Sequence, residues 1–267
     1  YFFVISPKML HIFAPKRHMI YKILFYQGGN IMNIALITAG GNGTRMHQDI
    51  PKQFLNVNNK PIIVYTMEAF QNHPDIDAIE VVCLDGWHQI LEAYAKQFNI
   101  TKLVGIVSGG KNGQESIKNG LNEINKKYSK DDIVIVHDGN RPLVSEEIIS
   151  DSIAKCLMYG SGIAAIPCVE AMLETDDRIS SNKQISRDNL MRTQTPHAFK
   201  LEKLLWAHEE AEKMGIKNSV ASCTLMLELG EKIYFSAGSE KNIKLTTPVD
   251  IEIFKALLNT QKDIWMK

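Results

Sequence analysis

Residues 33–54 read NIALITAGGNGTRMHQDIPKQF, and this stretch decides how the rest of the chain is interpreted. It opens with an apolar run, residues 34–38, of the kind that forms a strand buried on both faces. A glycine-rich turn follows at residues 39–43, and after it come two cations, Arg45 and Lys52. Glycines let backbone N–H groups approach an anion, and successive N–H groups form an anion-binding nest. Because arginine and lysine side chains can reach phosphates held over such a nest, the stretch indicates a polyphosphate site.

Two better-known phosphate-binding motifs do not fit this turn. The dinucleotide-binding fingerprint requires a third glycine at the start of a helix, where this chain has Met46 and then Pro51. The P-loop requires Gly-Lys-Ser/Thr after its spacer, whereas residues 43–45 are Gly-Thr-Arg. A tight turn without any ligand stays open as an alternative at this point, because a single glycine-rich turn is a weak signal.

The composition argues against a nucleic-acid or membrane partner. The 267 residues contain 30 Lys plus Arg and 30 Asp plus Glu, which gives a net charge of +0. Such a chain has no global field to attract nucleic acid or anionic lipid, so phosphate binding must come from local placement. No apolar stretch in the sequence reaches the roughly eighteen residues of a membrane span. The cysteines are widely spaced and are expected to be reduced core residues of a cytoplasmic protein: Cys83, Cys156, Cys168 and Cys223.

The first 31 residues differ from the rest of the chain. They are rich in aromatic and basic residues and show no clear helix or strand period. Gly28 and Gly29 lie just before Met32, and because glycine codons begin with GG, the pair is consistent with a translated ribosome-binding sequence. We therefore expect the native chain to start at Met32 and residues 1–31 to be a non-native or disordered extension of a domain at 32–267. Deletion of the extension is expected to leave folding and activity intact.

From residue 33 onward, strand patterns alternate with helix patterns. Such alternation predicts a mostly parallel sheet covered by helices on both faces, with its site at the carboxyl ends of the strands. The glycine turn and the loops at 108–116 and 137–142 each follow a strand, so all three are expected to meet at that edge. Strands are predicted at 54–57, 79–84, 103–107, 133–136, 163–168 and 232–235. Helices are predicted from Pro61 through Phe70, through residues 87–98, around Ile117 to Ile124, after Ser145, at 201–214, at about 222–229 and after Thr247.

Helix starts carry their own signals. Ser145 is predicted to cap one helix, and Pro61 to occupy the first position of another. Thr247 is predicted to cap the last helix, with Pro248 at the first position and Asp250 at the third. Between the elements, residues 170–189 are polar and weakly periodic, and a long polar excursion inside a domain is usually functional or an oligomer contact.

Six motifs then carry a resemblance across residues 33–258: GGxGxRM, PKQF, GG…S, HDxxRP, R…QTP and NIKxTTPxD, in this order. This order resembles the 2-C-methyl-D-erythritol 4-phosphate and D-ribitol 5-phosphate cytidylyltransferases, a family of polyol-phosphate cytidylyltransferases. The resemblance implies a single Rossmann-like nucleotidyltransferase domain with a mostly parallel sheet. It also implies that the acceptor phosphate attacks the α-phosphorus of CTP, which releases pyrophosphate and forms a CDP-alcohol.

The resemblance implies a role for each matching residue. Arg45 and Lys52 would stabilise the charge of the triphosphate in the transition state, and Asp138 would help to hold a magnesium ion, Mg²⁺. The acceptor phosphate would be positioned by Arg141, Arg187 and Lys244. In the family, an arm at about residues 169–187 crosses to a second subunit, which implies a homodimer. The nucleotide would be bound by Thr38, Ala39, Gly40, Gly41, Gly110 and Ser116.

Simpler interpretations exist for several of these residues. Asp138 could merely cap the turn before Pro142, since aspartate is a common turn residue. Arg187 and Lys244 could be ordinary surface cations, because exposed charges are the norm. His137 is expected to be a packed or orienting histidine rather than a base. Independent support comes from phosphoryl transfer itself, which requires positioning and positive charge, and from the preference of Mg²⁺ for carboxylate and phosphate oxygens.

The sequence departs from the family pattern at four places. Gly113 stands where an arginine is usual in the family. HDGNRP replaces the commoner HDAxRP or HDAVRP, which would put Asn140 beside the acceptor. Glu170-Ala171 and Val220-Ala221 replace Asp-Thr and Thr/Ser-Asp pairs. These changes concern the acceptor side, so they bear on substrate identity more than on reaction class.

Three functional hypotheses follow from the sequence. The stretch KQFLNVNNKPI is closer to the ribitol-phosphate branch, so D-ribitol 5-phosphate, which feeds teichoic-acid or capsule synthesis, is the preferred acceptor. The alternative acceptor is 2-C-methyl-D-erythritol 4-phosphate, which feeds isoprenoid synthesis. A catalytically silent nucleotide-binding homologue is the third hypothesis. The joint retention of Arg45, Lys52, Asp138, Arg187 and Lys244 argues against it.

Overall fold

The computed structural model describes residues 31–41 and 50–263. The chain divides into two units, Tyr1–Ile31 and Met32–Lys267, and every helix and strand named below belongs to the second. The hypothesis about the N-terminal extension concerns residues that lie, except for Ile31, outside the described part, so it stays a prediction.

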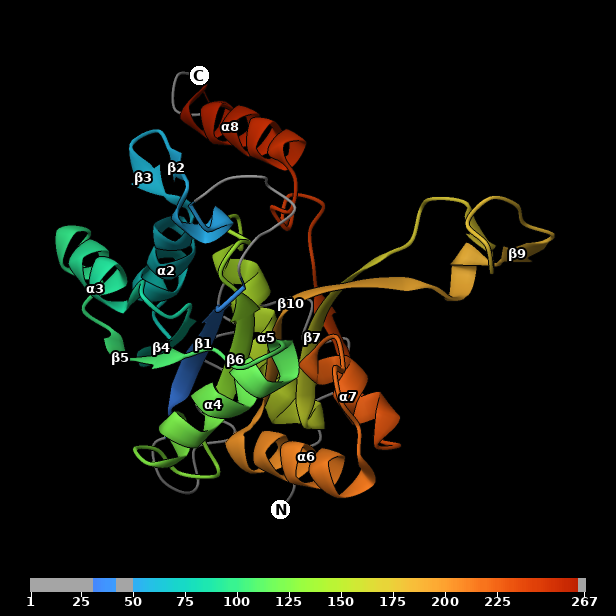
Figure 1. The fold of residues 1–267 in the computed structure, drawn as a ribbon, viewed down its shortest axis with the longest axis horizontal. Coiled ribbons are helices and arrows are strands. Elements are labelled where there is room, and N and C mark those ends of the chain that lie inside the picture. The colour runs from blue at the N-terminus through green and yellow to red at the C-terminus, as the bar shows by residue number, and fades with distance from the viewer. Residues whose placement is uncertain (1–30, 42–49, 264–267) are drawn as a thin grey trace, which may run out of the picture. The chain divides into compact units, whose positions relative to one another are not determined.

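A seven-stranded sheet forms the centre of this unit, in the order β11-β7-β10-β6-β1-β4-β5 (Figure 1). Six strands run parallel, and only β10 runs antiparallel to its neighbours β6 and β7. The predicted sheet is therefore confirmed. Its strands are β1 (Asn33–Ala39), β4 (Ala78–Cys83), β5 (Leu103–Ser108), β6 (Ile133–Asp138), β7 (Ser161–Pro167), β10 (Met191–Lys200) and β11 (Phe235–Ala237).

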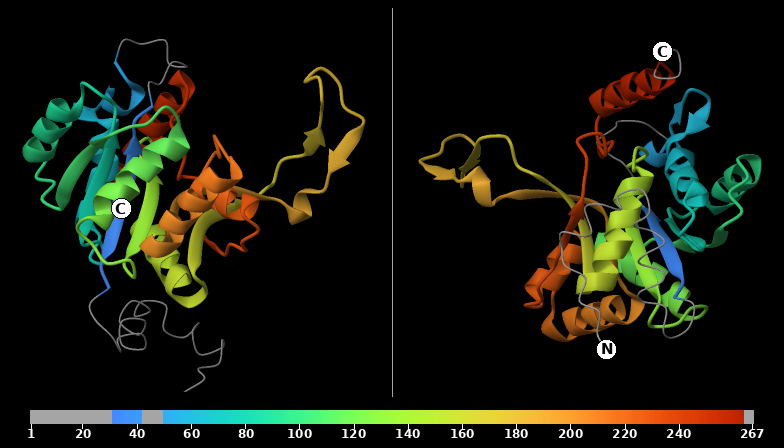
Figure 2. Two further views of the ribbon diagram at one scale, coloured as in Figure 1. Left: turned by 60° about the horizontal axis from the view of Figure 1, so that its bottom comes forward. Right: turned by 180° about the vertical axis from the view of Figure 1, so that it is seen from behind.

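Helices cover both faces of the sheet, as Figures 1 and 2 show. Strand side chains alternate between the faces, so Ile34 and Leu36 of β1 pack into the apolar cluster built by α4, α6 and α7. On the other face the ring of His137 lies 5.0 Å from that of Phe70 in α2. The helices are α2 (Ile62–Asn72), α3 (His88–Gln97), α4 (Gly113–Asn125), α5 (Glu146–Tyr159), α6 (Leu201–Met214), α7 (Ser222–Glu228) and α8 (Pro248–Asp263).

Two predicted helix starts are confirmed. The hydroxyl of Ser145 accepts a hydrogen bond from the backbone amide of Ile148 (3.4 Å) at the start of α5. Helix α8 starts at Pro248, and a carboxylate oxygen of Asp250 accepts from the backbone amide of Thr247 (2.7 Å). All four cysteines are buried and free, as expected of core residues.

Two local predictions are wrong near residue 60. Phe54 ends a 3-10 turn, Lys52–Phe54, and the strand that follows, β2, comprises only Asn56–Val57. Pro61 precedes α2 instead of opening it, because its backbone is extended (φ −60°, ψ 143°) and pairs within β3 (Lys60–Pro61).

Two further predictions are wrong in the second half of the chain. The strand expected at 232–235 lies three residues later, at β11. The sequence also did not predict β10, in which Pro196 and several polar residues hide the strand pattern. The pairing of β10 with β7 shifts register between Thr193 and His197, so the proline sits at an irregularity rather than in a regular ladder.

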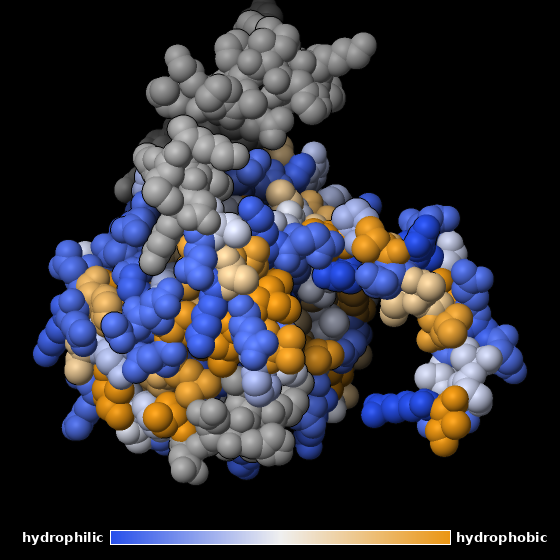
Figure 3. Space-filling model, turned by 90° about the horizontal axis from the view of Figure 1, so that it is seen from above, coloured by the Kyte–Doolittle hydropathy of each residue, from blue (hydrophilic) through white to orange (hydrophobic). Residues whose placement is uncertain are grey.

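An arm leaves the sheet between the end of β7 and the start of β10. It contains a small antiparallel hairpin, β8 (Met172–Glu174) with β9 (Lys183–Ile185), and it extends away from the helices and the sheet (Figures 1 and 2). Apolar surface is interspersed with hydrophilic surface along it (Figure 3). Leu173 is 62% exposed and Ile179 is 90% exposed, so the arm presents apolar groups that its own chain does not cover. None of the described helices is long and apolar enough to span a bilayer.

Candidate functional site

The parallel strands end at one cavity, and their register explains why. Thr38 of β1 lies beside Asp138 of β6, and Ala39 lies beside Cys83 of β4, which itself pairs with Ser108 of β5. The segments that follow these strands therefore meet at the same edge. The cavity has a volume of about 570 Å³. The predicted clustering of the three loops is confirmed.

Two glycine loops meet backbone against backbone in this cavity. A Cβ atom added to Gly40 would lie 3.3 Å from the Cα atom of Gly109, and one added to Gly109 would lie equally close to Gly40. One added to Gly110 would overlap the side chain of Glu115. A side chain at these positions would separate the two loops or displace neighbouring groups. The part of the cavity formed by the glycine loops therefore offers backbone groups to a ligand.

Gln53 holds the first glycine loop from behind. Its side chain is 2% exposed, and its Nε2 atom donates hydrogen bonds to the carbonyl oxygens of Ala39 (2.7 Å) and Gly41 (3.1 Å). These two hydrogen bonds hold the backbone of residues 39–41 in place. Lys52, one residue earlier, lines the cavity.

Ser116 and Asn112 shape the second glycine loop. The Ser116 hydroxyl accepts a hydrogen bond from the amide of Gly110 (2.9 Å) and donates one to the carbonyl of Asn112 (2.8 Å). The side chain of Asn112 caps α4 by accepting from the amide of Glu115 (2.9 Å). The first residue of α4, Gly113, lines the cavity, so the positive end of the helix dipole lies at the site.

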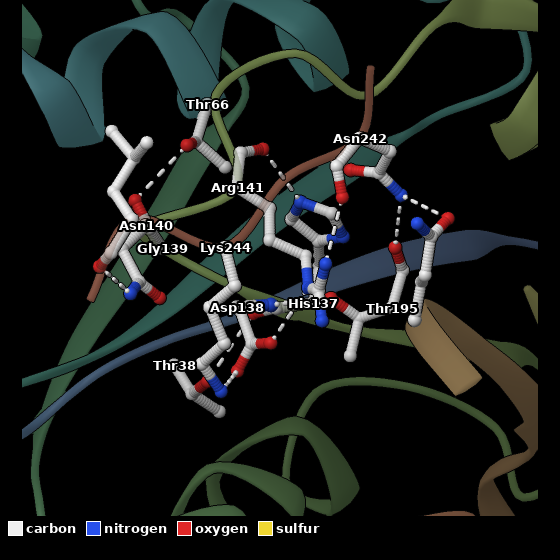
Figure 4. A network of polar contacts seen from close by, with 12 residues as sticks. Thr38, Thr66, His137, Asp138, Gly139, Asn140, Arg141, Thr195, Asn242 and Lys244 are labelled. Carbon is white, nitrogen blue, oxygen red and sulfur yellow. Dashed lines mark hydrogen bonds and ion pairs between the residues drawn. The ribbon is translucent and has the colours of Figure 1, made fainter. Parts of the chain in front are cut away.

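Asp138 is the centre of a polar network (Figure 4). One carboxylate oxygen accepts from Nε of Arg141 (3.0 Å) and the other from Nζ of Lys244 (3.0 Å). Its backbone amide donates to the hydroxyl of Thr195 (3.0 Å). Burial by itself would raise the pKa of Asp138, but the charges of Lys244 and Arg141 outweigh it and hold that pKa well below its ordinary value. The carboxylate is therefore ionised at neutral pH.

His137 is not among the described residues that line the cavity. It is fully buried, and burial lowers its pKa to about 4, so the ring is neutral at pH 7. Its Nε2 atom lies 3.1 Å from the carbonyl oxygen of Arg141, to which only a protonated ring nitrogen can donate. The prediction of a packed histidine is confirmed.

The cavity brings together most of the predicted site residues: Thr38, Ala39, Gly40, Gly41, Lys52, Gly110, Ser116, Asp138 and Lys244.

Two predicted cations, Arg141 and Arg187, lie elsewhere, and a third falls outside the described residues. Arg141 is behind Asp138, where its Nη1 atom donates to the carbonyl of Asn242 (2.7 Å), and it is not among the described residues that line the cavity. Arg187 is exposed on the arm, where its Nη1 atom donates to the carbonyl of Val169 (2.6 Å). Arg45 lies outside the described residues.

The cavity also contains residues to which sequence reasoning assigned no role. Asp85 lies two residues after the end of β4, so the rule that sites form at strand ends could have found it. Val220 is 89% exposed and lines the cavity from the loop before α7. It was noted only as a departure from the family pattern and was given no individual role. Gln53 was quoted within a motif but was given no function.

The donor set around Asp138 sets limits on a metal. Among residues 31–41 and 50–263, no group of three or more His, Cys, Asp or Glu side chains is arranged to hold an ion. One or two carboxylates beside a phosphate-binding wall suit a hard cation that takes its other ligands from phosphates and water. Asp138 and Asp85 both line the cavity, so the residues present fit Mg²⁺ bound together with a nucleotide.

Comparison with known proteins agrees with this geometry. The family model described as IspD, 2-C-methyl-D-erythritol 4-phosphate cytidylyltransferase, matches residues 33–260. A ribitol-5-phosphate cytidylyltransferase from Lacticaseibacillus paracasei is 44% identical, over 86% of this chain and 100% of that protein. Another from Vibrio parahaemolyticus is 39% identical, over 87% and 98%. A 2-C-methyl-D-erythritol 4-phosphate cytidylyltransferase from Clostridium botulinum is 36% identical, over 85% and 97%.

Solved structures match as well. A crystal structure of 4-diphosphocytidyl-2C-methyl-D-erythritol synthase has a TM-score of 0.72 with 22% identity, over 86% of this chain and 100% of that chain, and at this identity it supports the fold alone. The 2-C-methyl-D-erythritol 4-phosphate cytidylyltransferase of Francisella tularensis has a TM-score of 0.68 with 28% identity, over 83% and 97%. With its glycine loops, cations and carboxylate converging on one cavity, the chain belongs to the 2-C-methyl-D-erythritol 4-phosphate cytidylyltransferase family of CTP-dependent nucleotidyltransferases.

Proposed function

We propose that the protein transfers a cytidylyl group from CTP to D-ribitol 5-phosphate, which gives CDP-ribitol and pyrophosphate. The observation that carries this proposal is the convergence of Lys52, Asp138 and Lys244 with two glycine loops on one cavity. The choice of acceptor is supported by relatives of 44% and 39% identity that are ribitol-5-phosphate cytidylyltransferases.

The reaction needs little covalent chemistry from the protein. A phosphate monoester is already a nucleophile at neutral pH, so the enzyme has to align it with the α-phosphorus and offset negative charge. The backbone of the glycine loops and the N-terminus of α4 hold the nucleotide. Lys52, together with Arg45, stabilises the charge of the triphosphate, and Lys244 positions the acceptor phosphate.

Asp138 keeps a full negative charge at the cavity wall while its paired cations hold it in place. Mg²⁺, bound by Asp138 and by the nucleotide phosphates, would supply positive charge that offsets the charge of the triphosphate. Arg141 orients the carboxylate from behind and stays a candidate for acceptor binding. The four buried, free cysteines suit the cytoplasmic location that we propose.

The position of Arg187 supports a homodimer. This residue lies on an exposed arm, and it is not among the described residues that line the cavity of its own chain. If Arg187 binds the acceptor phosphate, it acts in the cavity of a second copy of this chain. The exposed Leu173 and Ile179 of the arm give that copy an apolar surface to cover.

The experiment is incubation of the protein with CTP, Mg²⁺ and each candidate acceptor, followed by measurement of pyrophosphate release. We expect turnover with D-ribitol 5-phosphate. The second candidate acceptor is 2-C-methyl-D-erythritol 4-phosphate, favoured by the family model and by the 36% identical relative from Clostridium botulinum. Turnover with that acceptor alone would show that it, and not D-ribitol 5-phosphate, is the substrate. Failure to bind CTP would favour a catalytically silent homologue.

A further inference from the structure

Asn140 joins the loop after β6 to the chain segment that carries Lys244. The side chain is 6% exposed, and its Nδ2 atom donates a hydrogen bond to the carbonyl oxygen of Leu245 (2.6 Å; Figure 4). The backbone of Asn140 also accepts a hydrogen bond from the amide of Leu245 (2.9 Å). Two bonds between the same pair of residues fix both the separation and the orientation of the two segments.

Lys244 lies between two anchored positions. On one side Leu245 is 1% exposed and packs into the apolar cluster that includes Phe254 of α8. On the other side the carbonyl of Asn242 accepts from Nη1 of Arg141 (2.7 Å). The backbone of Lys244 is therefore held from both directions, and only its side chain has freedom to move.

The ion pair between Lys244 and Asp138 is too weak to provide this order by itself. The Lys244 side chain is 41% exposed, and exposed ion pairs contribute little because water screens them and because the side chains lose freedom. The hydrogen bonds of Asn140 are buried, so competition with water weakens them less. The position of the lysine must therefore depend on the two hydrogen bonds between Asn140 and Leu245, which we call the clamp.

We propose that Asn140 is a positioning residue that sets Lys244 against Asp138 at the cavity, and that it thereby acts on the acceptor-phosphate half of the reaction. This inference rests on the proposed function, in which Lys244 positions that phosphate. Any amino acid at residue 140 supplies the backbone bond, whereas the second bond requires a side-chain donor. The complete clamp therefore requires a side chain such as asparagine at this position, because only the side chain supplies the second bond.

The test compares Asn140→Leu, which keeps the shape of the side chain and removes the donor, with Asn140→Ala. In both variants kcat/KM for D-ribitol 5-phosphate is expected to fall about ten- to a hundredfold, the usual effect of a displaced positioning group. KM for CTP should change little. The control is Thr66→Val, which removes the bond from the Thr66 hydroxyl to the carbonyl of Gly139 (3.0 Å) in the same loop. It should lower Tm without this kinetic effect.

A double-mutant cycle separates positioning from general structure. If Asn140 acts through Lys244, Asn140→Leu should cause no further loss in a Lys244→Met background. Losses that multiply, or an unchanged kcat/KM in Asn140→Leu, would overturn the proposal. If Lys244→Met leaves no measurable rate, a crystal structure of Asn140→Leu decides: the Lys244–Asp138 contact should open beyond about 4 Å, and an unchanged contact refutes the clamp. A wild-type protein that uses no polyol phosphate would defeat the proposed function, but that structure would still decide the clamp.

Discussion

Replacement of Gln53 by methionine should weaken CTP binding and leave the protein folded. The Gln53 amide donates to the carbonyls of Ala39 and Gly41, the two residues that flank Gly40 in the first glycine loop. Methionine is similar in length and flexibility but has no donor, so Gln53→Met removes both bonds and largely keeps the packing. The loop then becomes free to adopt conformations that do not bind phosphate.

The size of the effect follows from the two bonds. Each hydrogen bond contributes about 1 kcal/mol net, so the pair contributes about 2 kcal/mol. Ala39 is 4% exposed and its carbonyl cannot recover a water easily, whereas Gly41 is exposed and its carbonyl can. Since about 1.4 kcal/mol corresponds to a factor of ten, a loop that must be reordered on binding should raise the Kd for CTP roughly thirtyfold.

Calorimetric titration with CTP in the absence of acceptor measures this Kd, and thermal unfolding checks the fold. Gln71→Met is the matched control, because Gln71 donates to the Thr101 hydroxyl (3.0 Å) and accepts from the amide of Lys102 (2.9 Å), and none of these residues lines the described cavity. The control should bind CTP like the wild type. A folded Gln53→Met protein with a Kd within about threefold of the wild type would refute the reasoning.

The remaining predictions concern catalysis, assembly and pH. Lys52→Met should reduce the rate of pyrophosphate release by about a hundred- to a thousandfold at unchanged Tm, and a near-normal rate would remove Lys52 from the mechanism. Inactive Lys52→Met and Arg187→Ala proteins, when mixed and allowed to exchange subunits, should regain activity in the one site that combines both native residues; no recovery in a verified heterodimer would place Arg187 elsewhere. Burial lowers the pKa of His208 to about 4, so the unfolded chain binds more protons than the folded one between roughly pH 6.5 and 4. This histidine should therefore reduce the free energy of unfolding by up to about 1.4 kcal/mol per unit as pH falls through that window, and urea unfolding of His208→Gln at pH 5 and 7 should show a smaller pH dependence.

Much of the fold was predictable because its first half obeys simple periodicity. The buried runs at β1 and β6 are continuous and apolar, and the run at β4 is interrupted only by Glu80, which is the pattern of strands covered on both faces. Ser145 and Asp250 marked helix starts by local chemistry that needs no tertiary context. Strand β10 was not predictable in the same way, because neighbouring strands rather than its own residues make it extended.

The candidate site, like the fold, was only partly predictable from the sequence. The glycine loops and Asp138 directly follow strands, so their convergence follows from the topology of a parallel sheet. Lys244 could be assigned only through a resemblance, since it arrives from a segment far along the chain that is held by Asn140. Arg141 shows the limit most clearly, because its spacing from Asp138 says nothing of whether it points to a ligand or to the carbonyl of Asn242.

Strand β10 has a consequence for how assembly and chemistry are joined. It begins at Met191, at the root of the arm, and Thr195 within it accepts the hydrogen bond from the amide of Asp138. Strand β10 therefore connects the root of the arm to the backbone of Asp138 through a short piece of chain. A second subunit that binds the arm would hold this part of β10 in place, and with it the backbone of Asp138, without any other element between them.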